Sequence, residues 1–398
     1  MQESHALHSP NALDLTLQVS YPYRICFTHD TFALGNTTLQ ELLIHQSQSP
    51  RTLVLIDQGL TQTLPNLECE IRDWFGQSCP DITLSSILAL SGGEQSKVSL
   101  QPVRQALQAI IEAKIDRHSY VIAIGGGAFL DIIGFAAALA HRGVRLVRIP
   151  TTTLSQADSG VGVKNGINYQ GQKNYLGTFA VPWATVNDAR FLHIQPPLLA
   201  REGLTEAVKV AVVKDAHFFE FIESHIEALS ARQPDIFEET VNRSATLHAL
   251  HIATNGDPFE LGSSRPLDFG HWAAHFLESM SGYTLTHGEA VSLGICLDLL
   301  YSVKKDWIPL KQAQRIVSVL HQLGMPVSHP LMGKKERDEH PYQLLKGLDA
   351  FREHLGGELT ILMLHEIGRG VDVHDIDIPL MSTCLDEIVH LGTSPLLT

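Results

Sequence analysis

The chain has 398 residues with 43 acidic and 29 basic side chains, so its formal net charge is −14, and 44% of its residues are apolar. At about 150 residues per domain, this length predicts two to three domains that each bury a core, and it excludes disordered and collagen-like classes. An acidic chain without a run of Lys or Arg lacks the basic surface that nucleic acids and anionic membranes require, so we expect neither as a partner.

The first 150 residues alternate short apolar runs with amphipathic stretches. The runs at residues 52–57, 120–124 and 145–149 are rich in β-branched side chains, whereas residues 103–115 are amphipathic with helical spacing. Short, uniformly apolar strands joined by helices are typical of a parallel sheet that is covered on both faces. The pattern therefore predicts an α/β domain.

After about residue 188 the pattern becomes helical, with few strand signals. We predict an α/β domain at residues 1–188 and a mostly helical domain at residues 189–398, with the boundary at the strand-like segment 183–188. Residues 329–342, which are rich in charge and proline, are expected to form an exposed loop. The segments with helical periodicity are residues 198–229, 236–253, 270–281, 289–303 and 310–323.

The five cysteines are scattered and form no CxxC pair, so neither a disulfide framework nor a thiolate zinc site is predicted. A reducing, cytoplasmic setting fits this usage. The longest strongly apolar stretches, such as residues 132–140, are about half as long as a bilayer span requires. We therefore expect no membrane segment.

Three glycines, Gly125 to Gly127, follow directly on the apolar run at 120–124, and Asp131 lies in an apolar stretch expected to be helical. Glycines let the backbone approach a phosphate, and the amides of a helix N-terminus favour an anion. The third glycine of a GxGxxG fingerprint is missing, so a tight turn without a ligand stays the alternative. Upstream, Glu94 could reach a ribose and Lys97 a phosphate, although a solvated helix start is the favoured interpretation of that segment.

Basic residues gather between His141 and Lys214, where nine Lys or Arg face four acids. This excess of +5 in a chain of net charge −14 is interleaved with glycines around Lys164 and Lys173. A phosphate pocket built on loops needs such a segment, and a basic surface strip is the alternative.

Histidines and a carboxylate in the second half have the spacing of metal ligands. His271 and His275 lie four residues apart and so share a helical face, and His287 follows in a Thr-His-Gly-Glu turn. Upstream, Glu206 and Lys209 share a face at i, i+3. One carboxylate with two imidazoles is a usual catalytic zinc set, although 21 histidines also allow chance clustering.

A series of short motifs runs along the chain in a fixed order. They are GGGxxxD at 125–131, Arg-Gly at 142–143, Pro-Thr-Thr at 150–152, Asp158 with Lys164, GxKNxLGxF at 171–179, Glu-Ala-Val-Lys at 206–209, Phe-Gly-His at 269–271, His275, and His-Gly-Glu at 287–289. Together they resemble the 3-dehydroquinate synthase family and, more broadly, the sugar phosphate cyclases. The segments SRPLDFGHWAAH and REHLGGELTI resemble EboD-type cyclases most.

The resemblance implies an N-terminal Rossmann-like NAD-binding domain, a helical C-terminal metal-binding domain, a site between them and a homodimer. It implies that Zn²⁺, or Co²⁺ as a substitute, is held by Glu206, His271 and His287. The catalytic residues would be Lys164, Lys209, His275 and Asp158. The residues expected to bind the nucleotide are Asp57, Glu94, Lys97, Gly125, Gly126, Gly127, Asp131, Thr151 and Thr152; those expected to bind substrate are Arg142, Lys173, Asn174, Asp268, His248, Arg265 and Arg352. Acidic partners at Asp57 and Glu94 favour NAD over NADP, because they would repel a 2′-phosphate.

Departures from the family concern the carboxylate of its usual substrate. Where dehydroquinate synthases carry a lysine, an arginine and an asparagine, this chain has His248, Ser264 and Asp268. An acid at position 268 would repel a carboxylate and accept a hydrogen bond from a hydroxyl, while Arg265 could partly compensate. The order Arg-Pro-Leu-Asp-Phe-Gly-His resembles the sedoheptulose 7-phosphate cyclases.

We therefore expect a phosphate-eliminating cyclase that turns a phosphorylated seven-carbon ketose, sedoheptulose 7-phosphate, into a cyclitol. The steps would be transient oxidation by NAD, phosphate elimination, reduction and intramolecular aldol closure. One alternative is a true 3-dehydroquinate synthase acting on 3-deoxy-arabino-heptulosonate 7-phosphate. Another is a metal-dependent, glycerol-dehydrogenase-like alcohol dehydrogenase, which would not need the lysines of the glycine-rich segment. A binding scaffold without catalysis would be expected to have lost ligand or base residues.

Overall fold

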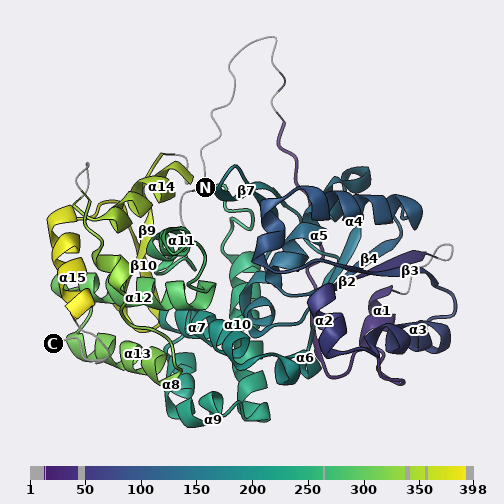
Figure 1. The fold of residues 1–398 in the computed structure, drawn as a ribbon, viewed down its shortest axis with the longest axis horizontal. Helices are drawn as coiled ribbons and strands as arrows, with labels where there is room; N and C mark the ends of the chain where they lie inside the picture. Colours follow the sequence, from purple (N-terminus) through teal and green to yellow (C-terminus); the bar gives the residue numbers. More distant parts are fainter. Residues whose placement is uncertain are drawn as a thin grey trace.

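A computed structural model describes residues 13, 15–43, 50–262, 265–336, 341–354 and 357–390. Ser264, one of the departures noted above, lies outside the described residues. The α/β part and the helical part lie side by side, with helices α7 (Pro197–Lys214) and α10 (Pro234–Thr254) between the sheet and the helices that follow residue 270 (Figure 1).

The first part is built on a six-stranded parallel sheet with the order β1-β8-β5-β4-β2-β3. Strands β4 and β5 are buried throughout nearly their whole length, as their uniformly apolar sequences predict. The predicted α/β class is confirmed. The strands are β1 (Ile25–Thr28), β2 (Arg51–Asp57), β3 (Thr83–Leu90), β4 (Tyr120–Gly125), β5 (Arg145–Pro150) and β8 (Ala184–Asp188).

Helices cover both faces of this sheet. Alternate residues of β2 enter two different cores: Leu53 and Leu55 pack with α4 (Gln101–Glu112) and α5 (Gly127–Leu139), whereas Val54 and Ile56 pack with α1 (Thr38–Leu43) and α3 (Leu67–Ser78). A short helix, α2 (Gln58–Thr63), follows β2. Because all six strands run parallel, the turns after β2, β4 and β5 lie at one edge of the sheet.

Residues 164–179 form an antiparallel hairpin, which corrects the expectation that this glycine-rich segment is a loop. Its strands are β6 (Lys164–Tyr169) and β7 (Gln172–Phe179), with Gln170 and Gly171 in the turn at positive φ. Gly166 and Gly177 face each other across the hairpin, where a Cβ would lie under 3.0 Å from the opposite backbone. The glycines therefore serve strand pairing.

The second part is mostly helical, as predicted, with one antiparallel hairpin that the sequence analysis missed, β9 (Ile361–Glu366) with β10 (Arg369–Val373). The predicted helical stretch 198–229 is three helices, because Asp215 interrupts it and caps the second by accepting a hydrogen bond from the Phe218 amide (3.1 Å). The remaining helices are α6 (Ala189–Ile194), α8 (Ala216–Ser224), α9 (Ile226–Ser230), α11 (His271–Met280), α12 (His287–Lys304), α13 (Leu310–Gln322), α14 (Lys346–His354) and α15 (Ile378–His390).

The predicted exposed loop at 329–342 is only partly one. Pro330–Gly333 form a 3₁₀ turn in which Met332 is fully buried, and Tyr342 is buried with its hydroxyl donating to Asp386. These two apolar anchors outweigh the charged composition that suggested a loop. Residues 337–340 lie outside the described part.

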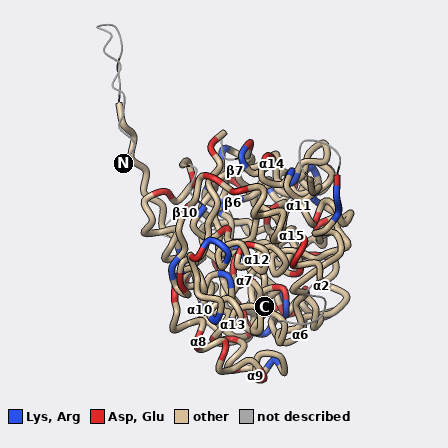
Figure 2. Tube along the Cα trace, turned by 90° about the vertical axis from the view of Figure 1, so that its left-hand side faces the viewer, with Lys and Arg blue, Asp and Glu red and all other residues tan. Residues whose placement is uncertain are grey.

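Acidic and basic residues are interspersed over the trace, and no large region of a single charge stands out in this view (Figure 2). In the described part of the chain, none of the helices has the length and apolar character needed to cross a membrane. Residues 15–24 form an extended arm that leads into β1.

Candidate functional site

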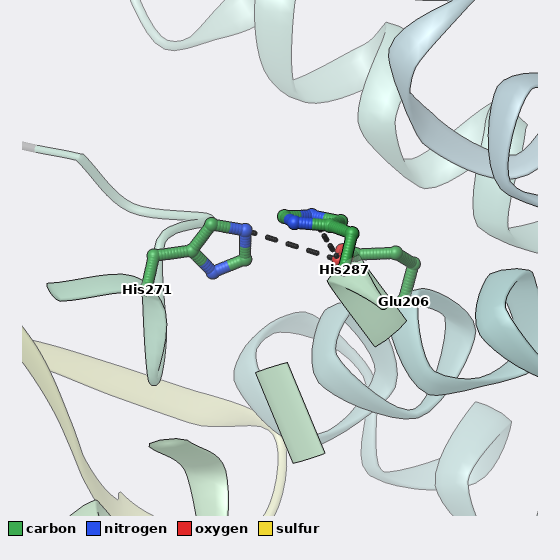
Figure 3. Close-up of side chains that lie close together, drawn as sticks. All are labelled: Glu206, His271 and His287. Atoms are coloured by element: carbon green, nitrogen blue, oxygen red, sulfur yellow. Dashed lines mark ion pairs between the residues drawn. The ribbon is translucent and has the colours of Figure 1, made fainter. Parts of the chain in front are cut away.

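Three side chains from three separate helices meet in the helical part, and we refer to them as the donor cluster: Glu206, His271 and His287 (Figure 3). Glu206 lies in the middle of α7, whereas His271 and His287 are the first residues of α11 and α12. Glu206 Oε1 lies 3.3 Å from His287 Nε2 and 3.8 Å from His271 Nε2.

Close backbone packing sets the two histidines side by side. Gly270 precedes α11 with φ of +78°, and a Cβ there would lie 2.6 Å from the amide nitrogen of Ile295 in α12. A Cβ at Gly294 would in turn lie 2.0 Å from the carbonyl oxygen of Gly270. A capping box of Thr286 and Glu289 starts α12 at His287. The two glycines thus let α11 start directly on the α12 backbone.

The donor cluster is electrostatically coupled to Lys209, one turn along α7, whose Nζ lies 2.5 Å from Glu206 Oε2. Burial would raise the pKa of Glu206, but Lys209 together with His287 and His271 outweighs burial and lowers that pKa to about 2. Burial, with Lys209 nearby, lowers the pKa of His271 to about 4. Burial would lower the pKa of His287, but Glu278 and Glu206 raise it to about 10. At neutral pH the cluster therefore presents an ionised Glu206, a neutral His271 and a His287 that gives up a proton when a metal binds.

This donor set fits a divalent metal ion. The Glu206 side chain is fully buried, and the Lys209 ammonium lies beside Oε2 only. Oε1 makes no hydrogen bond in the described part of the chain, so a cation placed between it and the two imidazoles would satisfy it. One carboxylate and two imidazoles is a ligand set that Zn²⁺ commonly takes at catalytic sites, where a further position stays open. Glu206, His271 and His287, the predicted metal ligands, are therefore brought together.

Glu278, which the sequence analysis missed, lies beside the donor cluster. It is buried on α11, and its oxygens lie 2.7 Å from Lys173 Nζ, 3.2 Å from His275 Nδ1 and 3.4 Å from His287 Nδ1. Burial would raise its pKa, but His287 and the other cations hold that pKa far below its usual range. The available signal was its spacing, because Glu278 follows His275 by three residues and His271 by seven on one helical face.

Lys173 and His275 are joined through Glu278 although they come from different parts of the fold. Lys173 reaches from β7 of the hairpin, whereas His275 lies on α11. Burial, opposed by Glu278, lowers the pKa of His275 below its usual value. Two predicted site residues thus meet at a carboxylate that was not predicted.

Asp158 and His248 form a second pair, with 2.8 Å between Asp158 Oδ1 and His248 Nδ1. Asp158 lies in a single π-helical turn, Ser155–Ser159, that packs against α7 and α10. Burial would raise the pKa of Asp158, but Lys209 and His248 hold it well below its usual range. The pair is thereby coupled to the donor cluster through Lys209.

Lys164 and Arg265 share one partner, Glu260, whose Oε2 lies 2.5 Å from Lys164 Nζ and 3.2 Å from Arg265 Nε. Arg265 Nη1 also donates to the carbonyl of Gly262 at 2.7 Å. Burial would raise the pKa of Asp268, but Lys164 and other nearby groups lower it, so Asp268 is an anion near Lys164.

At the carboxyl edge of the sheet, Asp57 and Thr152 border the glycine turn. A Cβ at Gly125 would lie 2.5 Å from the Phe129 ring and 3.0 Å from Asp57 Cβ, and one at Gly126 would lie 3.4 Å from Thr152 Cγ2. A Cβ at Gly127 would lie 2.5 Å from Ser159 Oγ. Packing alone thus requires glycine at two positions of this turn, while the amides at the start of α5 remain suited to an anion. Thr151 is buried and donates its amide to the Gly125 carbonyl.

Lys97 is not part of a solvated helix start, which corrects that interpretation. Its side chain is 3% exposed, and Nζ donates to Asp131 Oδ2 at 2.7 Å and to Asn174 Oδ1 at 2.5 Å. Glu94, in the same 3₁₀ turn, has one buried oxygen without a hydrogen-bond partner. Lys97 therefore ties the β6–β7 hairpin to α5 through residues predicted for two different ligands.

Two predicted substrate residues are not brought to these clusters. Arg142 is exposed and precedes β5, so it lies at the amino edge of the sheet, separated from the glycine turn by the 13 residues of α5, or roughly 20 Å. Arg352 pairs with Asp349 on its own helix, α14, at 3.1 Å and is largely exposed. Sequence position alone could not show which way these side chains lie.

Family models cover most of the chain that carries these clusters. A model described as 3-dehydroquinate synthase N-terminal matches residues 87–201, and one described as 3-dehydroquinate synthase C-terminal matches residues 203–347. The chain belongs to the 3-dehydroquinate synthase family. The resemblance inferred from its motifs is confirmed, and the protein is an enzyme of this family.

Relatives within and beyond the family agree with this assignment. A 3-dehydroquinate synthase of Halorhodospira halophila is 35% identical over 285 residues, 71% of this chain and 78% of the relative. The structure of a 2-epi-5-epi-valiolone synthase of Streptomyces hygroscopicus, with NAD⁺ and Zn²⁺ bound, is 25% identical with a TM-score of 0.83 and covers 95% of this chain and 99% of that one. A 2-deoxy-scyllo-inosose synthase structure shares the fold at 20% identity and a TM-score of 0.73, covering 91% and 96%.

Proposed function

We propose that this family member is a sugar phosphate cyclase that converts sedoheptulose 7-phosphate into a cyclitol with release of phosphate, using NAD and a Zn²⁺ ion that Co²⁺ can replace. The observation that carries the proposal is the donor cluster, in which the buried Glu206 carboxylate pairs with Lys209 through Oε2 and faces two imidazoles with Oε1. The valiolone synthase of similar structure, which holds NAD⁺ and Zn²⁺, supports the choice of cofactors.

Glu206, His271 and His287 would hold the metal, and the glycine turn with Asp57, Glu94 and Thr152 would hold NAD. When bound, these groups supply a Lewis acid and a reversible hydride acceptor, which together acidify a C–H bond beside the leaving phosphate. Burial raises the pKa of Asp57, and the Gly59 amide opposes this shift. An acidic side chain beside the turn favours NAD over its 2′-phosphorylated form.

The chain's own residues would bind the sugar and move its protons. His275 faces Glu278 with Nδ1, which leaves Nε2 to exchange a proton with substrate. Lys173 presents an ammonium for the phosphate, and Lys164 presents one to polarise a hydroxyl or carbonyl. Asp158, held as an anion by Lys209 and His248, would accept a hydrogen bond from a sugar hydroxyl.

The polar groups expected to meet the end of the substrate that carries the carboxylate in a heptulosonate favour a neutral ketose instead. Arg265 is engaged by Glu260 and the Gly262 carbonyl, His248 is engaged by Asp158, and Asp268 adds a negative charge. A carboxylate there would lose charged hydrogen bonds worth about 1.5–3 kcal/mol each, or roughly ten- to a hundredfold in binding. A hydroxyl could instead donate to Asp268.

A second candidate is 3-dehydroquinate synthase itself, because curated relatives about 35% identical to this chain carry that name. The deciding experiment measures phosphate release from sedoheptulose 7-phosphate and from 3-deoxy-arabino-heptulosonate 7-phosphate, each with NAD⁺ and Zn²⁺. We expect kcat/KM for the ketose to be at least tenfold higher, and Asp268→Asn to narrow that difference. Preference of the wild-type enzyme for the heptulosonate would overturn the proposal in favour of the second candidate.

We further propose that the enzyme works in the cytoplasm as a homodimer. Its free, scattered cysteines suit a reducing compartment. The extended arm supports dimerisation, since Leu15, Leu17 and Val19 are between 69% and 87% exposed.

A further inference from the structure

Two carboxylates flank the imidazole of His287, one at each ring nitrogen. Nε2 lies 3.3 Å from Glu206 Oε1 in the donor cluster, and Nδ1 lies 3.4 Å from Glu278 Oε1 on the opposite side. Glu206 and Glu278 come from different helices, α7 and α11. The His287 ring therefore lies between the metal ligand Glu206 at Nε2 and a carboxylate outside the donor cluster, Glu278, at Nδ1.

The Nδ1 atom of His287 needs a hydrogen-bond acceptor if Nε2 binds a metal. An imidazole that gives Nε2 to a metal carries its proton on Nδ1, and that proton needs an acceptor. His287 Nδ1 is buried and makes no hydrogen bond within the described part of the chain. Glu278 Oε1, at 3.4 Å, is about 0.4 Å beyond good hydrogen-bond distance, so a small rotation of either side chain completes the bond.

Glu278 contacts two further cationic or imidazole groups. Its Oε1 accepts from Lys173 Nζ at 2.7 Å, and its Oε2 lies 3.2 Å from His275 Nδ1. The Glu278 side chain is only 4% exposed, so solvent screens these electrostatic contacts little. One buried carboxylate thus fixes groups from β7, α11 and α12.

We propose that Glu278 is the positioning residue of this site: it accepts the Nδ1 proton of His287, so that Nε2 is presented to the metal, and it orients His275 and Lys173. The second half rests on the proposed function, whereas the first concerns metal binding alone. Glu278 itself is assigned no contact with the metal or the reacting atoms.

A competing assignment makes Glu278 a ligand of a second cation. His275, Glu278 and His287 each offer an atom, and these atoms lie within 4.8 Å of one another. Two observations argue against it. The Lys173 ammonium on Glu278 Oε1 would repel a second cation there, and His287 could serve two metals only by losing its Nδ1 proton. Positioning requires one metal ion per chain, and the competing assignment requires two.

The test is a titration of the full-length, metal-stripped protein with Co²⁺, followed by its visible absorption, which reports ligand geometry. We expect one Co²⁺ per chain. Glu278→Gln leaves one acceptor oxygen for three donors, so its Co²⁺ affinity should fall roughly 10- to 100-fold with an altered absorption spectrum. Glu260→Gln is the matched control, because it makes the same change at a partly buried carboxylate that pairs with Lys164 and Arg265 instead of with histidines, and it should bind Co²⁺ like the wild type.

Binding of two Co²⁺ ions, or equal affinity and spectra of Glu278→Gln and the wild type, would overturn the proposal. If Glu278→Gln fails to fold by circular dichroism, Glu278→Asp is measured in the same way, since it keeps the charge but withdraws the carboxylate by one methylene. The titration needs no substrate, so it stands even if neither heptulose phosphate is turned over. In that event the proposed function fails while the role of Glu278 in metal binding is still decided.

Discussion

His271 is the ligand whose loss should be easiest to detect, because it begins α11 with its ring against Glu206 and is 6% exposed. His271→Ala removes one of three donors, so we expect the metal content of the purified protein to fall from one ion per chain towards zero, together with phosphate release. The loss of affinity should exceed the roughly 10–100-fold that loss of an outer partner causes. His217→Ala, at a side chain 94% exposed, is the control. Full metal occupancy in His271→Ala, measured by elemental analysis, would contradict the assignment.

Asp298 contacts the residues on either side of His271, and its ionisation should make the stability of the folded protein depend on pH. Its oxygens accept from Trp272 Nε1 at 2.9 Å and from the Gly270 amide at 3.1 Å, and burial, opposed by these bonds, raises its pKa from 3.8 to about 7. The folded state thus binds this proton more tightly than the unfolded state. The resulting stability is complete below about pH 4 and is lost as pH rises through 7.

Asp298→Asn removes that titration, so the stability of the wild type relative to this variant should fall between pH 4 and 8, by roughly 4 kcal/mol at most. Urea unfolding at several pH values measures the difference, in which contributions common to both proteins cancel. A constant difference across this range would show that Asp298 is ionised throughout.

The contact between α5 and β6 helps to position the segment that runs from Asp158 to Lys164. A Cβ at Gly134 in α5 would lie 1.7 Å from Asn165 Oδ1, which accepts from the buried guanidinium of Arg148 at 2.5 Å. Arg148 also donates to the carbonyls of Gly160, Gly162 and Lys164. Helix α5 must therefore approach Asn165 this closely while Arg148 hydrogen-bonds both Asn165 and the carbonyls of residues 160–164.

Gly134→Ala should destabilise the protein by about 1–3 kcal/mol, because Asn165 must move away from Arg148. Gly76→Ala is the matched control, since Gly76 is an exposed helical glycine in α3 with open space around its Cβ position. That change should stabilise by about 0.5–1 kcal/mol. Thermal or urea unfolding compares the two, and similar changes of either sign would show that the close approach is not required.

Elements that depend on local pattern were predictable, and those that depend on distant partners were not. Strand β4 and helix α5 follow from an apolar run and a glycine turn. The β6–β7 hairpin was taken for a ligand loop because its glycines have an equally good reason to be there, the close pairing of Gly166 with Gly177. The metal ligands could be proposed from spacing and resemblance, whereas Glu278 gains its role only when the hairpin brings Lys173 to it.

At the scale of the whole molecule, the arm that precedes β1 has the alternation of a strand that is apolar on one face. Leu15, Leu17 and Val19 alternate with Thr16 and Gln18, and the apolar members are highly exposed. Contiguous exposed apolar side chains mark association sites, and an extended arm can add to the edge of a sheet. A second copy of the chain is the occupant that the proposed homodimer supplies.

We therefore expect light scattering after size exclusion to give twice the 43.8 kDa of one chain. Replacing Leu15, Leu17 and Val19 together by serine should raise the dimer dissociation constant by at least roughly three orders of magnitude, because each apolar side chain loses the 1.5–3 kcal/mol that its burial is worth. Ile111→Ser is the control, since Ile111 is an apolar side chain on α4 that is also highly exposed, at 68%, and is not part of the arm. A single-chain mass for the wild type would exclude the dimer. A triple variant that dimerises as tightly as the wild type would instead place the interface elsewhere, because the arm would then remain exposed in both states.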